Sequence, residues 1–288
     1  MILVTGANGH LGRLIVSHLV ARLGDTHQLA VSVRNPAQAT ELAEIGVTVR
    51  QGDFDRPDEL AQTFAGIDKL VLVSTDGPKE QRIAQHRNAI AAAKAAGVAH
   101  ILYTGFLDVA ADSPAEFAAV HRATEADLAA SGLKVTILRN PLYADYLPMT
   151  LAGAAETGVF HLPAGAGKAS FVSRDELAEA MAAAATAPNL AKTVYELTGQ
   201  ATHDYHEVAA TVAKVSGRPI RYEAVSKADY ATALQGHGLP AWVAAALANM
   251  YAAVAAGKFD RVSNDFAALV GHPPRPLACL AQELFGAH

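Results

Sequence analysis

Three glycines near the start of the chain carry the strongest chemical signal, because their spacing suits a loop that holds phosphate. Gly6, Gly9 and Gly12 directly follow the apolar segment 2–5 and open a helical pattern over residues 11–23. A tight turn between a buried strand and a helix presents backbone N–H groups at the positive end of that helix. The stretch therefore predicts a dinucleotide-binding loop, and with it either hydride transfer or cofactor sensing.

The spacing of this loop is G-x-x-G-x-x-G, which differs from the more common G-x-G-x-x-G. Asn8 stands where the middle glycine of that fingerprint would lie, and asparagine tolerates a positive φ better than most residues. A Cβ at Gly9 is expected to intrude on the phosphates, and Gly12 to allow close approach to the neighbouring strand. We expect the whole loop to contact the cofactor: Gly6, Ala7, Asn8, Gly9, His10, Leu11 and Gly12.

A basic residue ends the second predicted strand, 22 positions after Gly12. Arg34 occupies the place where an NAD-specific site presents a carboxylate to the ribose 2′-hydroxyl. A guanidinium binds a 2′-phosphate instead, so this residue predicts NADPH; the alternative is a solvated arginine at a strand end. Asp53 closes the third strand, where an acidic residue often contacts the adenine.

A parallel sheet is needed to bring these residues together, and the sequence predicts one. Strand-like segments occur at 29–33, 47–51, 69–74, 100–104 and 134–139, with helical patterns at 11–23, 37–45, 57–65, 79–96 and 114–131. The alternation predicts an α/β fold, a Rossmann-type doubly wound parallel sheet with ligands at the carboxyl ends of its strands. Small residues at two such ends either line the ribose and nicotinamide or serve the turns: Val73, Ser74, Thr75 and Thr104.

The pattern changes after Arg139, where residues 140–149 contain two prolines and two tyrosines. A helix returns over 172–186, with Ser173 and Glu176 as a capping box, and a strand follows over 194–199. We expect an NADP-binding Rossmann domain of residues 1–139 and 171–198. Residues 140–170 and 199–288 are expected to form a smaller α+β substrate lobe that closes over the cofactor.

Composition restricts the partners and the compartment. A net charge of −5 argues against nucleic acid or an anionic membrane as the main partner. The only cysteine, Cys279, permits no disulfide within the chain and favours the cytoplasm; we expect it to be an inert core thiol. No signal peptide or 18-residue apolar span is present, so membrane insertion is not expected. A homodimer is compatible with the sequence.

The ordered motifs resemble the NmrA-like group of atypical short-chain dehydrogenase/reductases, nearest the type-2 NADPH:quinone oxidoreductases and the triphenylmethane reductases. The resemblance spans the chain and rests on VTGANGHLG, VRNPAQA, VTVRQGDFDRPDEL, QHRNAIAAAKAAGVAHILYTG, HRATE, LRNPLY, TVYELTG and GHPPRPL. It implies that NADPH contacts Gly6 to Leu11, Arg34, the loop after Leu72 and the loop from Asn140 to Tyr146. That last loop contributes Asn140, Pro141, Leu142 and Tyr143.

One departure from ordinary short-chain dehydrogenases bears on mechanism. Their fifth helix carries Tyr-x-x-x-Lys, with the tyrosine as general acid, whereas this chain has His121 and Glu125 in those two positions. A carboxylate cannot replace the lysine, whose charge lowers the tyrosine pKa. Quinones are then better acceptors than simple ketones, because hydride addition leaves a phenolate with a pKa of about 10 instead of an alkoxide.

The catalytic candidates each have a structural alternative. His121 is either a donor on the substrate side or a structural residue near the cofactor. Tyr143 and Tyr146 either have a role in the site, where they cap the nicotinamide or stack on an aromatic substrate, or pack within the lobe. Phe106 has the same ambiguity. His121 with Glu125 lacks a third ligand in register, so we expect no metal there.

A second polar cluster, His203 to Glu207, lacks the second histidine of H-E-x-x-H and is better explained as a polar helix start. The sequence thus predicts an NADPH-dependent reductase of quinones or related conjugated, aromatic electrophiles. Two alternatives remain open: an NADP(H)-sensing regulator without turnover, and a biosynthetic reductase or isomerase with a specialised substrate.

Overall fold

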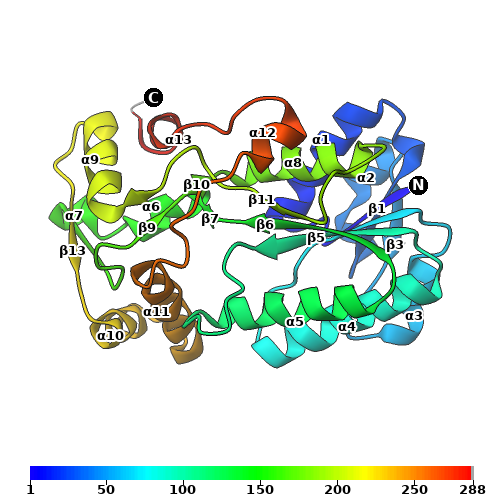
Figure 1. The fold of residues 1–288 in the computed structure, drawn as a ribbon, viewed down its shortest axis with the longest axis horizontal. Coiled ribbons are helices and arrows are strands. Elements are labelled where there is room, and N and C mark those ends of the chain that lie inside the picture. Colours follow the sequence, from blue (N-terminus) through cyan, green and yellow to red (C-terminus); the bar gives the residue numbers. More distant parts are fainter. Residues whose placement is uncertain (287–288) are drawn as a thin grey trace.

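A seven-stranded parallel sheet forms the centre of the computed structural model, which describes residues 1–286 (Figure 1). The strand order is β11-β6-β5-β4-β1-β2-β3, and all neighbouring pairs are parallel. The strands are β1 (Ile2–Thr5), β2 (Leu29–Val33), β3 (Thr48–Gln51), β4 (Lys69–Leu72), β5 (His100–Phe106), β6 (Lys134–Asn140) and β11 (Val194–Glu196). The order changes direction at β1, which leaves a crevice at the carboxyl ends, as in Rossmann folds. The expected fold class is confirmed.

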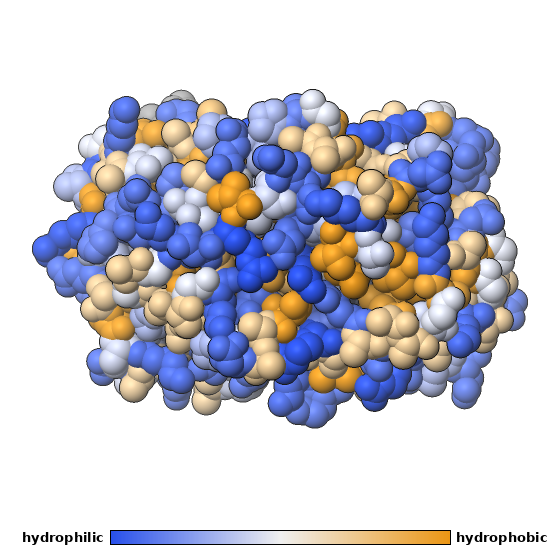
Figure 2. Space-filling model, in the orientation of Figure 1, coloured by the Kyte–Doolittle hydropathy of each residue, from blue (hydrophilic) through white to orange (hydrophobic). Residues whose placement is uncertain are grey.

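Helices cover both faces of this sheet. One layer contains α1 (His10–Leu23), α8 (Arg174–Thr186) and α12 (Asp265–Val270), and the other contains α3 (Pro57–Thr63), α4 (Lys79–Ala95) and α5 (Glu116–Ala130). A short helix, α2 (Thr40–Glu44), precedes β3. The buried alanines of α8 allow it to pack closely on α1. In Figure 2, apolar side chains reach the surface mainly between the two helical layers, while the helices present mostly polar groups.

The expected capping box at the start of α8 is confirmed. Ser173 Oγ accepts a hydrogen bond from the Glu176 amide at 3.2 Å, and the Glu176 carboxylate accepts one from the Ser173 amide at 3.1 Å. These reciprocal bonds satisfy two N–H groups that a helix start leaves open. Asp145, in the loop that follows β6, also accepts a hydrogen bond from the Arg174 amide. This bond holds the first residue of α8 beside that loop.

A second group of elements lies beyond the carboxyl ends of β5 and β6. Its strands are β7 (Leu142–Tyr143), β8 (Val159–Leu162), β9 (Lys168–Ala169), β10 (Phe171–Val172), β12 (His203–Asp204) and β13 (Arg221–Ala224). Its helices are α6 (Leu147–Thr150), α7 (Ala154–Thr157), α9 (Tyr205–Ser216), α10 (Lys227–Gly236), α11 (Ala241–Ala255) and α13 (Leu277–Phe285). These elements share a core of their own around Phe160, Tyr205 and Phe259. By contrast, α12 packs on α8 and β11 of the central sheet.

Two expectations about the last ninety residues have clear outcomes. Asp204 caps α9 and forms a capping box with Glu207, which confirms the interpretation of that cluster as a polar helix start. The expectation of a buried Cys279 was wrong, because this residue is exposed. In α13, Leu277, Leu280 and Ala281 form the buried face, and Cys279 lies on the side of the helix turned to solvent.

No helix within residues 1–286 combines the length and apolarity needed to cross a membrane.

Candidate functional site

A long cleft with a volume of about 450 Å³ runs along the carboxyl ends of the strands. Its walls come in turn from the segments that follow β3, β2, β1, β4 and β5, and then from the loop after β6. The sheet order therefore fixes the order of groups along the cleft. One end is formed by residues after β2 and β3, the glycine loop lies near the middle, and residues after β5 and β6 form the other end.

The glycine loop has the geometry of a phosphate cradle. Gly6 has a φ of 62°, which a residue with a side chain rarely adopts. A Cβ on Gly12 would lie 2.2 Å from the carbonyl oxygen of Gly6, and one on Gly9 would lie 3.2 Å from the same atom. Gly9 is the N-cap of α1 and offers no side-chain cap, so the first N–H groups of that helix stay open to the cleft.

The details of this loop differ from the sequence-based expectation at two residues. Asn8 lines the cleft but does not have a positive φ; the left-handed turn occurs at Gly6. Gly12 permits a close approach to the Gly6 backbone just after β1, where we expected a contact with the neighbouring strand.

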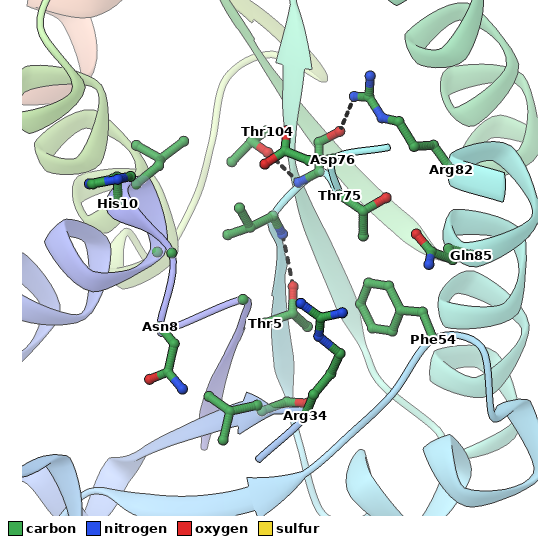
Figure 3. A pocket seen from close by; sticks show the side chains of 18 of the residues that line it. Thr5, Asn8, His10, Arg34, Phe54, Thr75, Asp76, Arg82, Gln85 and Thr104 are labelled. Atoms are coloured by element: carbon green, nitrogen blue, oxygen red, sulfur yellow. Dashed lines mark hydrogen bonds between the residues drawn. The ribbon is translucent and has the colours of Figure 1, made fainter. Parts of the chain in front are cut away.

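Arg34 and Asp53 lie at the β2–β3 end of the cleft. Both line it, and Figure 3 shows the Arg34 guanidinium projecting into the cavity, opposite the Phe54 ring. Within the part of the chain that the structure describes, Arg34 makes no ion pair, so its charge is available to an anion. Phe54 provides an apolar surface beside it, and Gln85 lines the same end.

Hydrogen bonds hold the turn after β4 open toward the cleft. Thr5 Oγ1 accepts from the Val73 amide at 3.0 Å, and Thr104 Oγ1 accepts from the Ser74 amide at 2.8 Å (Figure 3). The Thr75 amide donates to His86 Nε2 at 3.0 Å. Burial and the nearby Arg82 charge lower the pKa of His86 to about 3, so it stays a neutral acceptor. The residues at the ends of β4 and β5 therefore serve the turn and the cleft together. Thr104 bonds to the turn, and Val73, Ser74, Thr75 and Thr104 all line the cleft.

The end of the cleft beyond β5 is aromatic. Phe106 stacks on His121 with ring centroids 5.5 Å apart, and Tyr143 stacks on Tyr146 with centroids 5.9 Å apart. All four side chains line the cavity. Burial raises the pKa of Tyr143 to about 12, and its hydroxyl accepts a hydrogen bond from Asn140. The arrangement suits a planar, conjugated molecule.

His121 is buried, and its Nδ1 lies 2.8 Å from the Tyr103 hydroxyl. Burial, together with the Arg82 charge, lowers its pKa well below the ordinary value. Glu125, one turn further along α5, is held by Arg139 through bonds of 2.9 and 2.7 Å. Residues 1–286 contain no group of three or more histidine, cysteine or acidic side chains placed to hold a metal.

The structure brings most of the expected site residues to one cleft. Those that line it are Gly6, Asn8, Gly9, His10, Leu11, Gly12, Arg34, Asp53, Val73, Ser74, Thr75, Thr104, His121 and Tyr143. The remaining expected residues are buried behind the lining: Ala7, Asn140, Pro141 and Leu142. Asn140 acts on the site through its bond to Tyr143, and Leu142 belongs to β7, which pairs with β10.

Several lining residues carried no signal that we used in the sequence. They are Thr5, Ser32, Val33, Asn35, Gln38, Phe54, Asp76, Arg82, Gln85, Gly105 and Arg174. Most directly precede or follow an expected residue at a strand end, so extending each expected strand end by two positions would have found them. Arg82, Gln85 and Arg174 come from helices, and only the packing of α4 and α8 brings them to the cleft.

The chain matches the model of a family described as NAD(P)H-binding over residues 6–188. It is 39% identical over 285 residues to quinone oxidoreductase 2 of Escherichia coli, with 99% of each chain covered. An E. coli NADPH-dependent quinone oxidoreductase, solved with NADPH, superposes with a TM-score of 0.94 at 38% identity, covering 99% of this chain and all of the other. The Citrobacter triphenylmethane reductase solved with NADP(H) gives 0.92 at 34% identity, covering 98% and 99%.

Proposed function

Since the chain belongs to the NmrA-like family of NAD(P)H-binding proteins, we propose that it is an NADPH-dependent reductase of quinones and related conjugated, aromatic electrophiles. Relatives of this family that are solved or named as quinone and triphenylmethane reductases support this activity. The observation that carries it is the aromatic end of the cleft, which holds no tyrosine–lysine pair. A substrate reduced there must accept a hydride without a strong general acid.

The cleft fits NADPH, because the open N–H groups at the start of α1 face its middle and the Arg34 guanidinium, which makes no ion pair among the described residues, stands at one end. We propose that the glycine loop and the start of α1 bind the pyrophosphate. Arg34 would bind the 2′-phosphate, and Asp53 would contact the adenosine. When bound, NADPH supplies a hydride from its nicotinamide ring. In this proposal the nicotinamide ring would lie beside Ser74, Thr104 and Tyr143, which line the cleft after β4, β5 and β6.

Positioning accounts for most of the catalysis in this proposal. Phe106 and Tyr143 orient a planar acceptor against the cofactor and exclude water from it. His121 stays neutral, and burial raises the pKa of Tyr143 to about 12, which makes it a weaker acid than a free tyrosine. A quinone needs no proton in the hydride step, because its product is a delocalised phenolate.

We further propose that residues 140–170 and 199–288, apart from α12, act as the substrate lobe, and residues 1–139 and 171–198 as the cofactor domain, on which α12 packs. Tyr143 and Tyr146 join the two, since they lie in the loop after β6 and line the cleft. We also propose that the protein works in the cytoplasm, because a single cysteine offers no disulfide within the chain.

The test is NADPH oxidation against quinones, cationic triphenylmethane dyes, enones and simple ketones. We expect turnover of quinones and dyes and none of simple ketones. Gly9→Val serves as the control, because it should lose cofactor binding while keeping the circular dichroism of the wild type. NADPH binding without turnover of any acceptor would contradict the proposal and favour a sensing regulator.

A further inference from the structure

Arg82 places a buried positive charge in the cleft without a carboxylate to balance it. Its side chain is 5% exposed, yet it lines the cavity. Nη2 donates to Ser74 Oγ at 2.9 Å, as Figure 3 shows, and the buried Nε has no hydrogen-bond partner. Within the described part of the chain, no carboxylate lies within ion-pair distance of this guanidinium. Asp76 acts on it only from longer range.

A buried cation at the position of Arg82 does little to stabilise the fold. Burial of a charge is unfavourable unless the charge is paired, and an arginine in the first turn of a helix opposes the helix dipole. Arg82 lies in the first turn of α4. Among the described residues, the Arg82 guanidinium lies over one aromatic ring only, that of Phe117. Its central carbon is 5.6 Å from the centre of that ring. Its charge, unbalanced at a position that lines the cavity, therefore points to a partner that occupies the cleft.

The proton on His121 can be assigned from Arg82. His121 Nε2 lies 3.5 Å from Arg82 Nη2, which is at the long limit of a hydrogen bond. Arginine always donates, so a neutral histidine must present its lone pair at Nε2 and carry its proton on Nδ1. That Nδ1–H then donates to the Tyr103 oxygen at 2.8 Å. His121 consequently holds Arg82 in place and offers no proton to a substrate.

Arg82 also lies at the correct end of the cleft for the acceptor. It contacts Ser74 in the turn after β4 and His121 in α5, and His121 stacks on Phe106. These residues form the aromatic end, on the opposite side of the glycine loop from Arg34. An acceptor bound among the aromatic rings can therefore turn a carbonyl oxygen toward the guanidinium.

We propose that Arg82 is a further catalytic residue, whose guanidinium contacts the oxygen of the acceptor and stabilises the negative charge that this oxygen gains. The inference rests on the proposed quinone reductase activity. In the step, the hydride carries two electrons from the cofactor C–H bond to the quinone, which leaves NADP⁺ and a hydroquinone monoanion. The anion then takes one proton from water, so that the quinone has gained two electrons and two hydrogens.

The first experiment measures charge stabilisation without turnover. 4-Nitrophenol, whose phenolate is yellow, is titrated by absorbance while bound to enzyme saturated with NADP⁺. We expect its pKa to be lower by about 1 to 3 in the wild type than in Arg82→Gln, because an opposite charge at contact favours the ionised phenol. Arg87→Gln is the matched control, since Arg87 lies on the same helix but is exposed and paired with Asp127. Equal pKa values in the wild type and Arg82→Gln would overturn the proposal.

The second experiment separates charge from structure by the choice of acceptor. Arg82→Gln should lower kcat/KM for a quinone by about ten- to a hundredfold, the loss expected for one charge-assisted hydrogen bond. Activity on a cationic triphenylmethane dye should not fall, because that acceptor becomes neutral and develops no oxyanion. Arg82→Lys should recover part of the quinone activity. An equal loss on both acceptors, with unchanged NADPH affinity and Tm, would show that Arg82 only shapes the site.

The two experiments distinguish this inference from the proposed function. If the wild type reduces quinones and Arg82→Gln does so equally well, the function holds and the role of Arg82 is wrong. If no quinone is reduced but the nitrophenol pKa still depends on Arg82, the oxyanion site holds and the proposed substrate is wrong.

Discussion

Arg139 holds Glu125 through two hydrogen bonds, from Nε to Oε1 at 2.9 Å and from Nη2 to Oε2 at 2.7 Å. Both side chains are largely buried. Glu196 lies 3.5 Å from the same guanidinium and pairs in turn with Arg261 at 2.8 Å. The position that ordinary short-chain dehydrogenases fill with lysine is therefore part of a network that joins α5 to β6 and β11. The carboxylate at this position stabilises the fold around the site and is not free to act on a substrate.

Replacing Glu125 with lysine should destabilise the protein without creating a ketone reductase. The substitution places two cations side by side in a largely buried position, and breaking such a pair costs on the order of 3 kcal/mol. Urea denaturation measures the loss. The control is Asp127→Asn, which breaks the more exposed pair with Arg87 and should cost less than about 1 kcal/mol. A stable Glu125→Lys variant that reduces simple ketones would contradict this account.

His121→Ala should lower kcat/KM for a quinone by less than about a hundredfold, the lower limit for loss of a general acid. The reason is that burial lowers the pKa of His121 well below its usual value and Arg82 faces its lone pair. The wild-type pH–rate profile should therefore show no limb near pH 6.5, the ordinary histidine value. A thousandfold loss, with disappearance of such a limb in the variant, would identify His121 as the proton donor.

Arg34→Ala should weaken NADPH binding by about ten- to a hundredfold and leave NADH binding nearly unchanged. A charge-assisted contact to the 2′-phosphate accounts for a loss of this size, and NADH lacks that phosphate. Fluorescence titration of both cofactors against the wild type and the variant measures it. Arg56, which pairs with Glu59 outside the cleft, provides the control variant Arg56→Ala. Equal affinities of the wild type for the two cofactors would refute the assignment.

Stability should decrease on acidification because of a buried histidine far from the cleft. Burial, with the charges of Lys134 and Lys69, lowers the pKa of His100 to about 4. Between pH 6.5 and about 4 the unfolded chain binds a proton at this residue that the folded chain excludes, so the free energy of unfolding falls as the pH falls. The slope from one such group is at most about 1.4 kcal/mol for each pH unit.

Denaturation midpoints measured across that pH range test this prediction. His100→Gln keeps a group that can bond to Thr136, the present partner of His100 at 2.9 Å, and should reduce the slope by the share of His100 while the buried His86 and His121 keep theirs. The variant His237→Gln, at an exposed histidine, provides the matched control. A slope that does not change in His100→Gln would show that this histidine is not responsible.

Sequence patterns predicted the α/β class, the glycine loop, Arg34, the capping box at Ser173 and the polar helix start at Asp204. These features depend on residues close together in the chain. A strand pattern that runs into Gly6, or an acceptor side chain three residues before a glutamate, specifies its local conformation whatever lies around it. Residues at strand ends were also predictable as a group, since parallel strands bring their carboxyl ends to one edge of the sheet.

Tertiary structure alone decided which helix residues reach the cleft and which charges are paired. Arg82 lies in the helix predicted over residues 79–96, and only the packing of α4 against α5 and the turn after β4 buries it beside His121. The bond from Arg139 to Glu125, the burial of Asn140 behind Tyr143 and the exposure of Cys279 are of the same kind. Each depends on segments distant in sequence, because side-chain burial and pairing are set by which surfaces meet when the chain folds.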